Sequence, residues 1–257
     1  MTGVFAAGDA VLRVSRATAP LAVAIARARV LAAAGVRVPR PLADDVVMTD
    51  DGLQVTAWER VAIHGAPVDW VAVGSMVAAV HRLDLAATGP LPFAWDFPWW
   101  DGAALLERTA DLVDPVASAA LHRAWEADRW WRHGAERDLV VCHGDVHPGN
   151  VLAAVDGPVI LDWDLVCLAP AGWDHAPLLT WEARWGGDPG IYPDFATGYG
   201  ASLADDPTTV ALARLRLLAA TLMRLEAGRD DEEAAAEAQR RLRWWRGDPD
   251  APVWRPM

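Results

Sequence analysis

Two short apolar runs separated by a turn are the clearest feature of the hydrophobic pattern. Residues 151–155 and 159–161 are rich in side chains that favour strands, and Asp156-Gly157 between them is a typical turn. We therefore expect a β-hairpin. If its turn is centred near Asp156, position 150 faces position 162, so the polar residues at these two positions lie together at the open end.

The first 60 residues alternate between short strands and turns, with one helix. Hairpins are expected over residues 4–14 and 46–58, with turns at Gly8-Asp9 and Asp50-Asp51-Gly52. Between the hairpins, an Ala-rich segment from Pro20 to Ala34 predicts a helix, with Gly35 as its C-cap.

From Asp69 onward the apolar positions follow helical spacing. Val73, Val77 and Val80 recur at i, i+4 and i+7, which predicts a helix. Further helices are expected where an Asp-Pro pair supplies an N-cap and a first-turn proline, and near the end of the chain. These segments are Asp114-Pro115 to about His133, Asp206-Pro207 to Gly228, and about 231–245, with a strand at residues 139–142.

Composition limits the compartment and the class of partner. The formal net charge of −12 argues against nucleic acid or an anionic membrane as partner. It favours a cationic substrate, but a solvated acidic surface is the simpler explanation. No apolar run is long enough to span a membrane, no signal peptide is visible, and two cysteines form no disulfide framework, so we expect a cytoplasmic protein. The oligomeric state stays open.

Candidate chemistry gathers at the open end of the hairpin at residues 150–162. Asn150 and Asp162 would present an amide oxygen beside a carboxylate, a ligand set that suits Mg²⁺. Asp145 lies on the loop entering the same end and is placed to accept a proton from a hydroxyl. A base Asp, then Asn, then a metal-binding Asp is the arrangement for phosphoryl transfer in protein-kinase-like enzymes. The alternative is a loop whose acids merely cap turns.

The motif His-Gly-Asp-x-x-x-x-Asn at residues 143–150, followed by Asp162-Trp163-Asp164, resembles the aminoglycoside phosphotransferase and choline kinase-like small-molecule kinases. The resemblance implies an α/β (α+β), two-lobed protein-kinase-like fold. A small, abbreviated N-terminal sheet lobe would span residues 1–61, with a hinge at about 58–62. A larger, mainly helical catalytic and substrate-binding lobe would span residues 62–257.

The same resemblance implies the reaction. Asp145 would be the catalytic base, Asn150 and Asp162 would hold Mg²⁺, and ATP or GTP would be the co-substrate. The acceptor would be a hydroxyl of a small molecule, with aminoglycoside-like antibiotics as one candidate class and sugars, amino alcohols and other natural products left open.

Supporting roles also follow from the resemblance. Arg13 stands where the family carries a phosphate-binding Lys, although an exposed edge-strand Arg is the alternative. Glu59 and Val61 lie at the hinge, whose backbone would contact adenine. His143 and Asp174 would stabilise the catalytic loop. Candidates for the acceptor side are His147, Asp164 (also a candidate for a second metal), Glu182, Asp188 and Asp194, with Trp181 or Trp185 as an apolar wall; a solvated acidic loop is the alternative for the segment at 181–199.

Two features depart from the family pattern. No acid occurs between Ala10 and Pro41, so the Glu that the family pairs with its Lys, expected near Ala24, is missing. No glycine-rich phosphate loop precedes Arg13. These departures motivate a second hypothesis, a degenerate kinase-fold protein that binds a ligand or partner without catalysis. The complete set of Asp145, Asn150 and Asp162 favours the enzyme.

Overall fold

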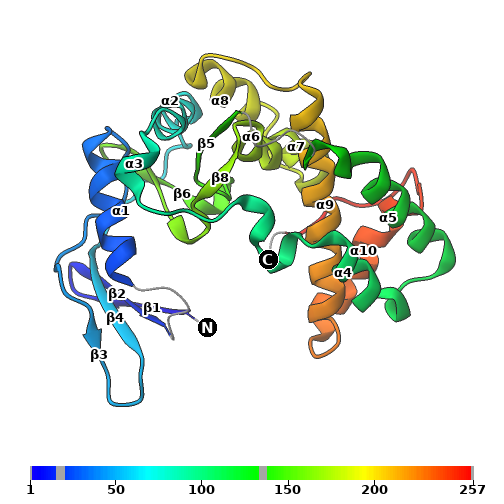
Figure 1. Ribbon diagram of the computed structural model, residues 1–257, viewed down its shortest axis with the longest axis horizontal. Coiled ribbons are helices and arrows are strands. Elements are labelled where there is room, and N and C mark those ends of the chain that lie inside the picture. The colour runs from blue at the N-terminus through cyan, green and yellow to red at the C-terminus, as the bar shows by residue number, and fades with distance from the viewer. Residues whose placement is uncertain (1, 16–20, 133–137, 256–257) are drawn as a thin grey trace.

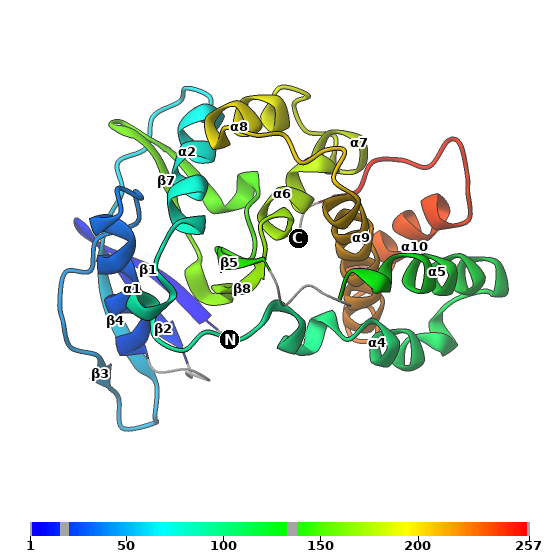
Figure 2. The same ribbon diagram turned by 45° about the horizontal axis from the view of Figure 1, so that its top comes forward.

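A computed structural model describes residues 2–15, 21–132 and 138–255, and shows a mixed α/β fold with a small sheet region and a larger helical part (Figures 1 and 2). The N-terminal sheet and α1 lie at one end of the molecule, and the long helix α9 lies toward the other end. Two small two-stranded sheets lie between them. This is the fold class that the sequence predicts.

The N-terminal sheet is antiparallel, with strand order β1-β2-β4-β3. Both expected hairpins are confirmed, and Gly8 and Gly52 occupy the turns with φ of +63° and +78°. The helix after β2 ends at Ala33, and Gly35 follows it with a φ of +82° and donates its N–H to the Ala32 carbonyl at 3.0 Å, as expected for its role at the C-cap. The expected start at Pro20 lies outside the described residues. The elements are β1 (Thr2–Ala7), β2 (Ala10–Ser15), α1 (Leu21–Ala33), β3 (Val47–Met48) and β4 (Gln54–Glu59).

The central hairpin is present, but its register differs by one residue from the prediction. Strand β6 (Val151–Ala154) pairs with β7 (Gly157–Ile160) so that Ala154 faces Gly157. Gly157 has a φ of +112° and begins the second strand directly, which shortens the turn to two residues. Position 150 therefore faces 161 rather than 162. The consequence for the site is small, because Asp162 is the next residue.

A further strand, which the hydrophobic pattern did not predict, completes the centre of the fold. Strand β8 (Cys167–Pro170) pairs antiparallel with the expected strand β5 (Leu139–Cys142). The loop from β5 to β6 and the loop from β7 to β8 therefore lie against each other. They carry residues 143–150 and 161–166, which contain the candidate chemistry.

Several helices begin where the sequence predicts them. The carboxylates of Asp69, Asp114 and Asp206 each accept a hydrogen bond from the first turn of the following helix. The third expected helix ends early, at Asp128, and gives way to a 3₁₀ turn over Arg129–Arg132; its expected end at His133 lies outside the described residues. The helices are α2 (Trp70–His81), α3 (Leu85–Thr88), α4 (Gly102–Arg108), α5 (Pro115–Asp128), α6 (Gly172–Leu179), α7 (Trp181–Trp185), α8 (Ile191–Tyr199), α9 (Pro207–Ala227) and α10 (Glu232–Trp245).

Helices α7 and α8 occupy the segment for which a solvated acidic loop is one of the two sequence interpretations. Helix α8 packs against α2, and glycines at the contact, Gly74 and Gly198, let the two backbones approach closely. No helix within the described residues is long and apolar enough to cross a lipid bilayer.

Two buried clusters surround the central loops. One is rich in tryptophan and joins β5 and β8 to α4, α5, α6, α9 and α10. The other lies beneath α1 and α2 and includes Val141, Ile160 and Val166. Both clusters contact the sheet of β5 and β8, and the second also contacts β6 and β7, so the loops at the ends of these strands are supported from both sides.

Candidate active site

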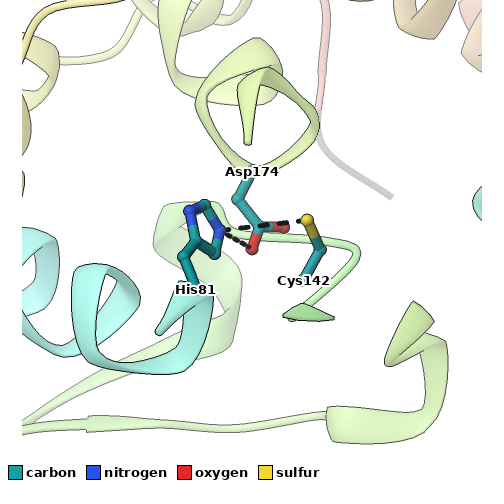
Figure 3. Close-up of side chains that lie close together, drawn as sticks. All are labelled: His81, Cys142 and Asp174. Atoms are coloured by element: carbon teal, nitrogen blue, oxygen red, sulfur yellow. Dashed lines mark hydrogen bonds and ion pairs between the residues drawn. The ribbon is translucent and has the colours of Figure 1, made fainter. Parts of the chain in front are cut away.

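A fully buried carboxylate supports the first of the two central loops. Asp174 of α6 accepts hydrogen bonds from the backbone N–H groups of His143 and Gly144 at 2.8 and 2.9 Å. It also accepts one from His81 Nε2 at 3.1 Å (Figure 3). Burial opposes ionisation, but these donors, His81 first, lower the pKa of Asp174. Asp174 therefore stabilises the loop from below, as the family resemblance implies.

Cys142 lies beside the same carboxylate (Figure 3). Ligand atoms of His81, Cys142 and Asp174 lie within 4.8 Å of one another, which is compatible with a metal ion. Burial, however, raises the pKa of the Cys142 thiol well above its usual value, and the nearby Asp174 charge adds to this effect. Because a thiol binds metals as its thiolate, and because Asp174 is already satisfied by three donors, we interpret the cluster as structural.

The first turn of the loop requires glycine. Gly144 has a φ of +96°, and a Cβ there would lie 2.1 Å from the Leu165 carbonyl oxygen of the second loop. His143 connects the two loops as well, since its Nε2 donates to the Leu161 carbonyl at 2.7 Å and its Nδ1 accepts from the Asp145 N–H at 3.1 Å. The imidazole thereby fixes the backbone that carries Asp145.

Asp145 is half-buried among polar partners. His147 Nε2 lies 3.3 Å from its Oδ2, and the Asn150 amide donates to its backbone carbonyl at 2.9 Å. Burial alone would raise the pKa of Asp145, but the hydrogen bond from His147 and the positive charge of Arg216 lower it to about 2. Asp145 is therefore ionised at neutral pH.

Arg216 of α9 is a site residue that the sequence interpretation missed. Its Nη1 donates to the Gly144 carbonyl at 3.0 Å, and its Nη2 forms an ion pair with Asp145 Oδ1. The guanidinium lies over the rings of Trp99 and Trp173, 5.7 Å from each centroid. The sequence offers one feature that could have identified this residue: Arg216 stands between two leucines on a long helix, and both leucines are buried.

Asn150 and Asp162 lie at the same end of the hairpin, as expected. The Leu161 N–H donates to the Asn150 carbonyl at 2.8 Å, which places Asp162 directly after this contact. Since the Asn150 amide nitrogen is engaged with Asp145, its side-chain oxygen is the atom left for another ligand. Burial, followed by the negative charge of Asp164, raises the pKa of Asp162. Excess negative charge beside a free amide oxygen suits a cation such as Mg²⁺.

Asp162 also has an unusual backbone conformation. Its φ of +57° is the one positive value at a residue other than glycine within the described residues. Such conformations cost free energy and occur often at functional sites. Here the turn directs the chain from β7 into the short 3₁₀ segment Trp163–Leu165.

Arg13 and Asp164 form an ion pair across the two parts of the molecule. Arg13 of β2 donates from Nη1 to Asp164 Oδ1 at 2.8 Å, and its Nη2 contacts Oδ2. This hydrogen bond, more than any other influence, raises the pKa of Arg13. Asp164 thus faces the N-terminal sheet and pairs with an arginine there.

The predicted hinge residues lie where β4 leaves the sheet. The Glu59 carboxylate accepts two hydrogen bonds from Arg40, one from its backbone N–H at 3.1 Å and one from its side-chain Nε at 3.2 Å. Val61 is half-buried in the connection that follows. Ile63 then pairs with Ala154 of β6 as an isolated bridge, which connects the segment after β4 to the central hairpin.

On the predicted acceptor side, the structure joins aromatic groups to Asp145. The His147 ring stacks on Trp181 at a centroid distance of 5.6 Å, and Trp181 stacks on Trp185 at 5.7 Å. Among the described residues, none of the three acids in this segment forms a hydrogen bond or ion pair with the loop of Asp145. These acids are Glu182, Asp188 and Asp194, and all three are exposed.

Comparison with known proteins decides the family. The model of the phosphotransferase enzyme family matches residues 4–218. The chain belongs to this phosphotransferase family. No curated protein matched it in the sequence comparison. The chain matches solved structures at low identity, and these likenesses show the fold.

Three solved structures illustrate the likeness. Aminoglycoside phosphotransferase APH(4)-Ia is 19% identical, with a TM-score of 0.72 over 96% of this chain and 90% of that one. Spectinomycin phosphotransferase in complex with ADP and spectinomycin is 16% identical, with a TM-score of 0.67 over 95% and 88%. A choline/ethanolamine kinase family protein from Mesorhizobium loti is 21% identical, with a TM-score of 0.67 over 97% and 85%. The kinase-like fold expected from the sequence is confirmed.

Proposed function

We propose that this phosphotransferase transfers the γ-phosphoryl group of ATP or GTP to a hydroxyl of a small molecule. The observation that carries the proposal is the meeting of Asp145, Asn150 and Asp162 at the ends of two interlocked loops. Family membership supports phosphotransfer, and similar structures contain ADP, AMP or AMP-PNP. In this proposal residues 1–61 form the nucleotide-binding lobe, with Glu59 and Val61 at the hinge, and residues 62–257 form the catalytic lobe.

Asp145 would orient the acceptor hydroxyl and accept its proton. Arg216 engages Oδ1, so Oδ2, beside His147, is the oxygen that would face the hydroxyl. With a pKa of about 2, Asp145 is a weak base, and its contribution is mainly to position the nucleophile. This suits phosphoryl transfer, in which positioning and charge stabilisation supply most of the catalysis.

The side-chain oxygen of Asn150 and the carboxylate of Asp162 would hold Mg²⁺. When bound, the ion neutralises negative charge on the transferring phosphates. Asp164 is a candidate for a second cation, and Arg13 would contact phosphate once its pairing with Asp164 is released.

The acceptor would lie against His147 and the stacked rings of Trp181 and Trp185. Similar structures hold spectinomycin or hygromycin B, which makes aminoglycoside-like antibiotics the first class to screen. Amino groups of such an acceptor would meet the acids Glu182, Asp188 and Asp194 near the same aromatic wall.

A kinase fold that binds a ligand without catalysis is the second candidate. Two observations favour it: Arg13 is engaged with Asp164, and no acidic residue of α1 pairs with Arg13. The two candidates differ in whether nucleotide binding requires Mg²⁺ and whether Asp145 supports turnover.

Calorimetric titration tests the proposal. ATP and GTP are each titrated with and without Mg²⁺ into wild type and Asp162→Asn. We expect Mg²⁺-dependent binding that the variant weakens at least tenfold. No binding of either nucleotide to folded wild type would overturn the proposal. Once an acceptor is found, Asp145→Ala should lower turnover by orders of magnitude, and a fully active variant would contradict the role of Asp145.

A further inference from the structure

Helix α1 presents an arginine, not an acid, on its inward side. Ile25, Ala28 and Leu31 are buried on this helix, and Arg27 lies half-buried between them. Arg27 is three residues, about one helical turn, after Ala24, so the two positions share a face. Ala24 is where the family resemblance places the missing acid.

The Arg27 side chain reaches the central loops. It lines a small cavity together with Val141 of β5 and Val166, two residues beyond Asp164. Its Nε is buried and has no hydrogen-bond partner among the described residues. Leaving such a donor unpaired is costly, so this arrangement lowers the stability of the unliganded protein.

The negative charge of Asp164 acts on both arginines, Arg13 and Arg27. Arg13 pairs with Asp164 directly, and the negative charge of Asp164 partly offsets the lowering of the Arg27 pKa by burial. Asp162 adds a second negative charge nearby. A divalent cation at Asp162 would leave the cluster with excess positive charge, which an anionic ligand would balance.

We propose that Arg27 is a second phosphate-binding residue of the nucleotide site. Together with Arg13 it takes the place of the Lys–Glu pair and of the glycine-rich loop, and Asp164 pairs with Arg13 until phosphate replaces it. Guanidinium groups suit this role, since their planar forks bind phosphate oxygens in pairs. The inference rests on the proposed function, because it assigns a residue to the same nucleotide site.

Calorimetry with ATP, ADP and AMP, each with Mg²⁺, tests the inference on wild type, Arg27→Met, Arg27→Lys and Arg29→Met. Arg29 is the matched control, because it lies on the same helix with its side chain 52% exposed and paired with Asp44. Its replacement removes the same charge at a distance from the loops. The melting temperature of each unliganded protein is measured in parallel.

We expect Arg27→Met to weaken ATP binding by about 10- to 100-fold, the range for a lost hydrogen bond to a charged group. AMP binding should change much less, Arg27→Lys should retain part of the ATP affinity, and Arg29→Met should match wild type. The unliganded Arg27→Met protein should melt at or above the wild-type temperature, since the unpaired donor is gone.

Three outcomes would overturn the inference. The first is an ATP affinity of Arg27→Met equal to that of wild type. The second is a loss of affinity in this variant that is as large for AMP as for ATP. The third is a melting temperature of unliganded Arg27→Met so far below wild type that partial unfolding explains the weaker binding. Each of these leaves the proposed function standing, provided that wild type binds ATP with Mg²⁺. Failure of wild type to bind would overturn the proposed function and this inference together.

Discussion

Arg216 and Asp145 form an ion pair although 71 positions separate them in the sequence. The contact connects α9 to the loop between β5 and β6. Because Arg216 also donates to the Gly144 carbonyl at 3.0 Å, it fixes both the carboxylate and the backbone beside it. The long helix α9 therefore contributes directly to the geometry of the site.

Replacing Arg216 by Met should lower kcat by about 10- to 100-fold with little change in KM for ATP. The physical reason is the loss of a charge-assisted hydrogen bond that positions Asp145, which costs about 1.5–3 kcal/mol. Steady-state kinetics with an identified acceptor would measure this change. Arg214→Met is the control, because Arg214 lies on the same helix but pairs with Asp128 of α5 at 3.1 Å. Equal losses in both variants would contradict a specific role for Arg216.

Asp174→Asn should destabilise the protein by about 3–5 kcal/mol, the typical effect of breaking a buried ionic network. The amide cannot accept from His143, Gly144 and His81 at once without also presenting its own donors to them. Urea unfolding at neutral pH measures the free-energy difference. The exposed Asp138, one residue before β5, supplies the control Asp138→Asn, which should stay within about 0.5 kcal/mol of wild type. A similar small effect in Asp174→Asn would refute the structural role of this carboxylate.

The sequence predicted local features well because local chemistry determines them. Asp114 and Asp206 cap helices as expected. Asp145, Asn150 and Asp162 lie within one short stretch of chain. A single hairpin brings that stretch together.

Long-range pairs could not be predicted in this way. The contacts of Arg216 with Asp145 and of Arg13 with Asp164 depend on packing between distant elements. Strand β8 exists because it pairs with β5, and its four residues have no strong pattern of their own. The predicted register of the central hairpin was wrong by one residue, because Gly157, with its positive φ, is the first residue of the second strand and not part of the turn.

Gly74→Ala should destabilise the protein by about 1–3 kcal/mol, the usual cost of overpacking, or somewhat more. A Cβ at Gly74 of α2 would lie 2.0 Å from the Phe195 carbonyl oxygen, so the two helices would have to separate. Thermal unfolding measures the change. Gly65→Ala is the matched control, since no atom lies within 4 Å of the added carbon there. Equal melting temperatures for Gly74→Ala and wild type would show that the contact between α2 and α8 adapts easily.

Acid should destabilise the protein through His175. This side chain is fully buried, and its Nε2 has no hydrogen-bond partner among the described residues. Burial, followed by the positive charge of His81, lowers its pKa from 6.5 to about 4, while Asp174 opposes the shift. The unfolded chain therefore binds more protons between these two pH values, so stability is full above about pH 6.5 and falls as the pH decreases toward 4.

From pH 7 to pH 5 this linkage should remove about 2 kcal/mol of unfolding free energy. His175→Phe, which keeps an aromatic ring beside Tyr192, Phe195 and Tyr199, should flatten that part of the pH dependence. Urea titrations at both pH values measure it. His122→Phe replaces an exposed histidine of α5 and should keep the wild-type slope. The opposite outcome is that His175→Phe loses as much stability as wild type between the two pH values. That result would contradict the prediction, because the pH dependence would then come from proton uptake by another group and not from His175.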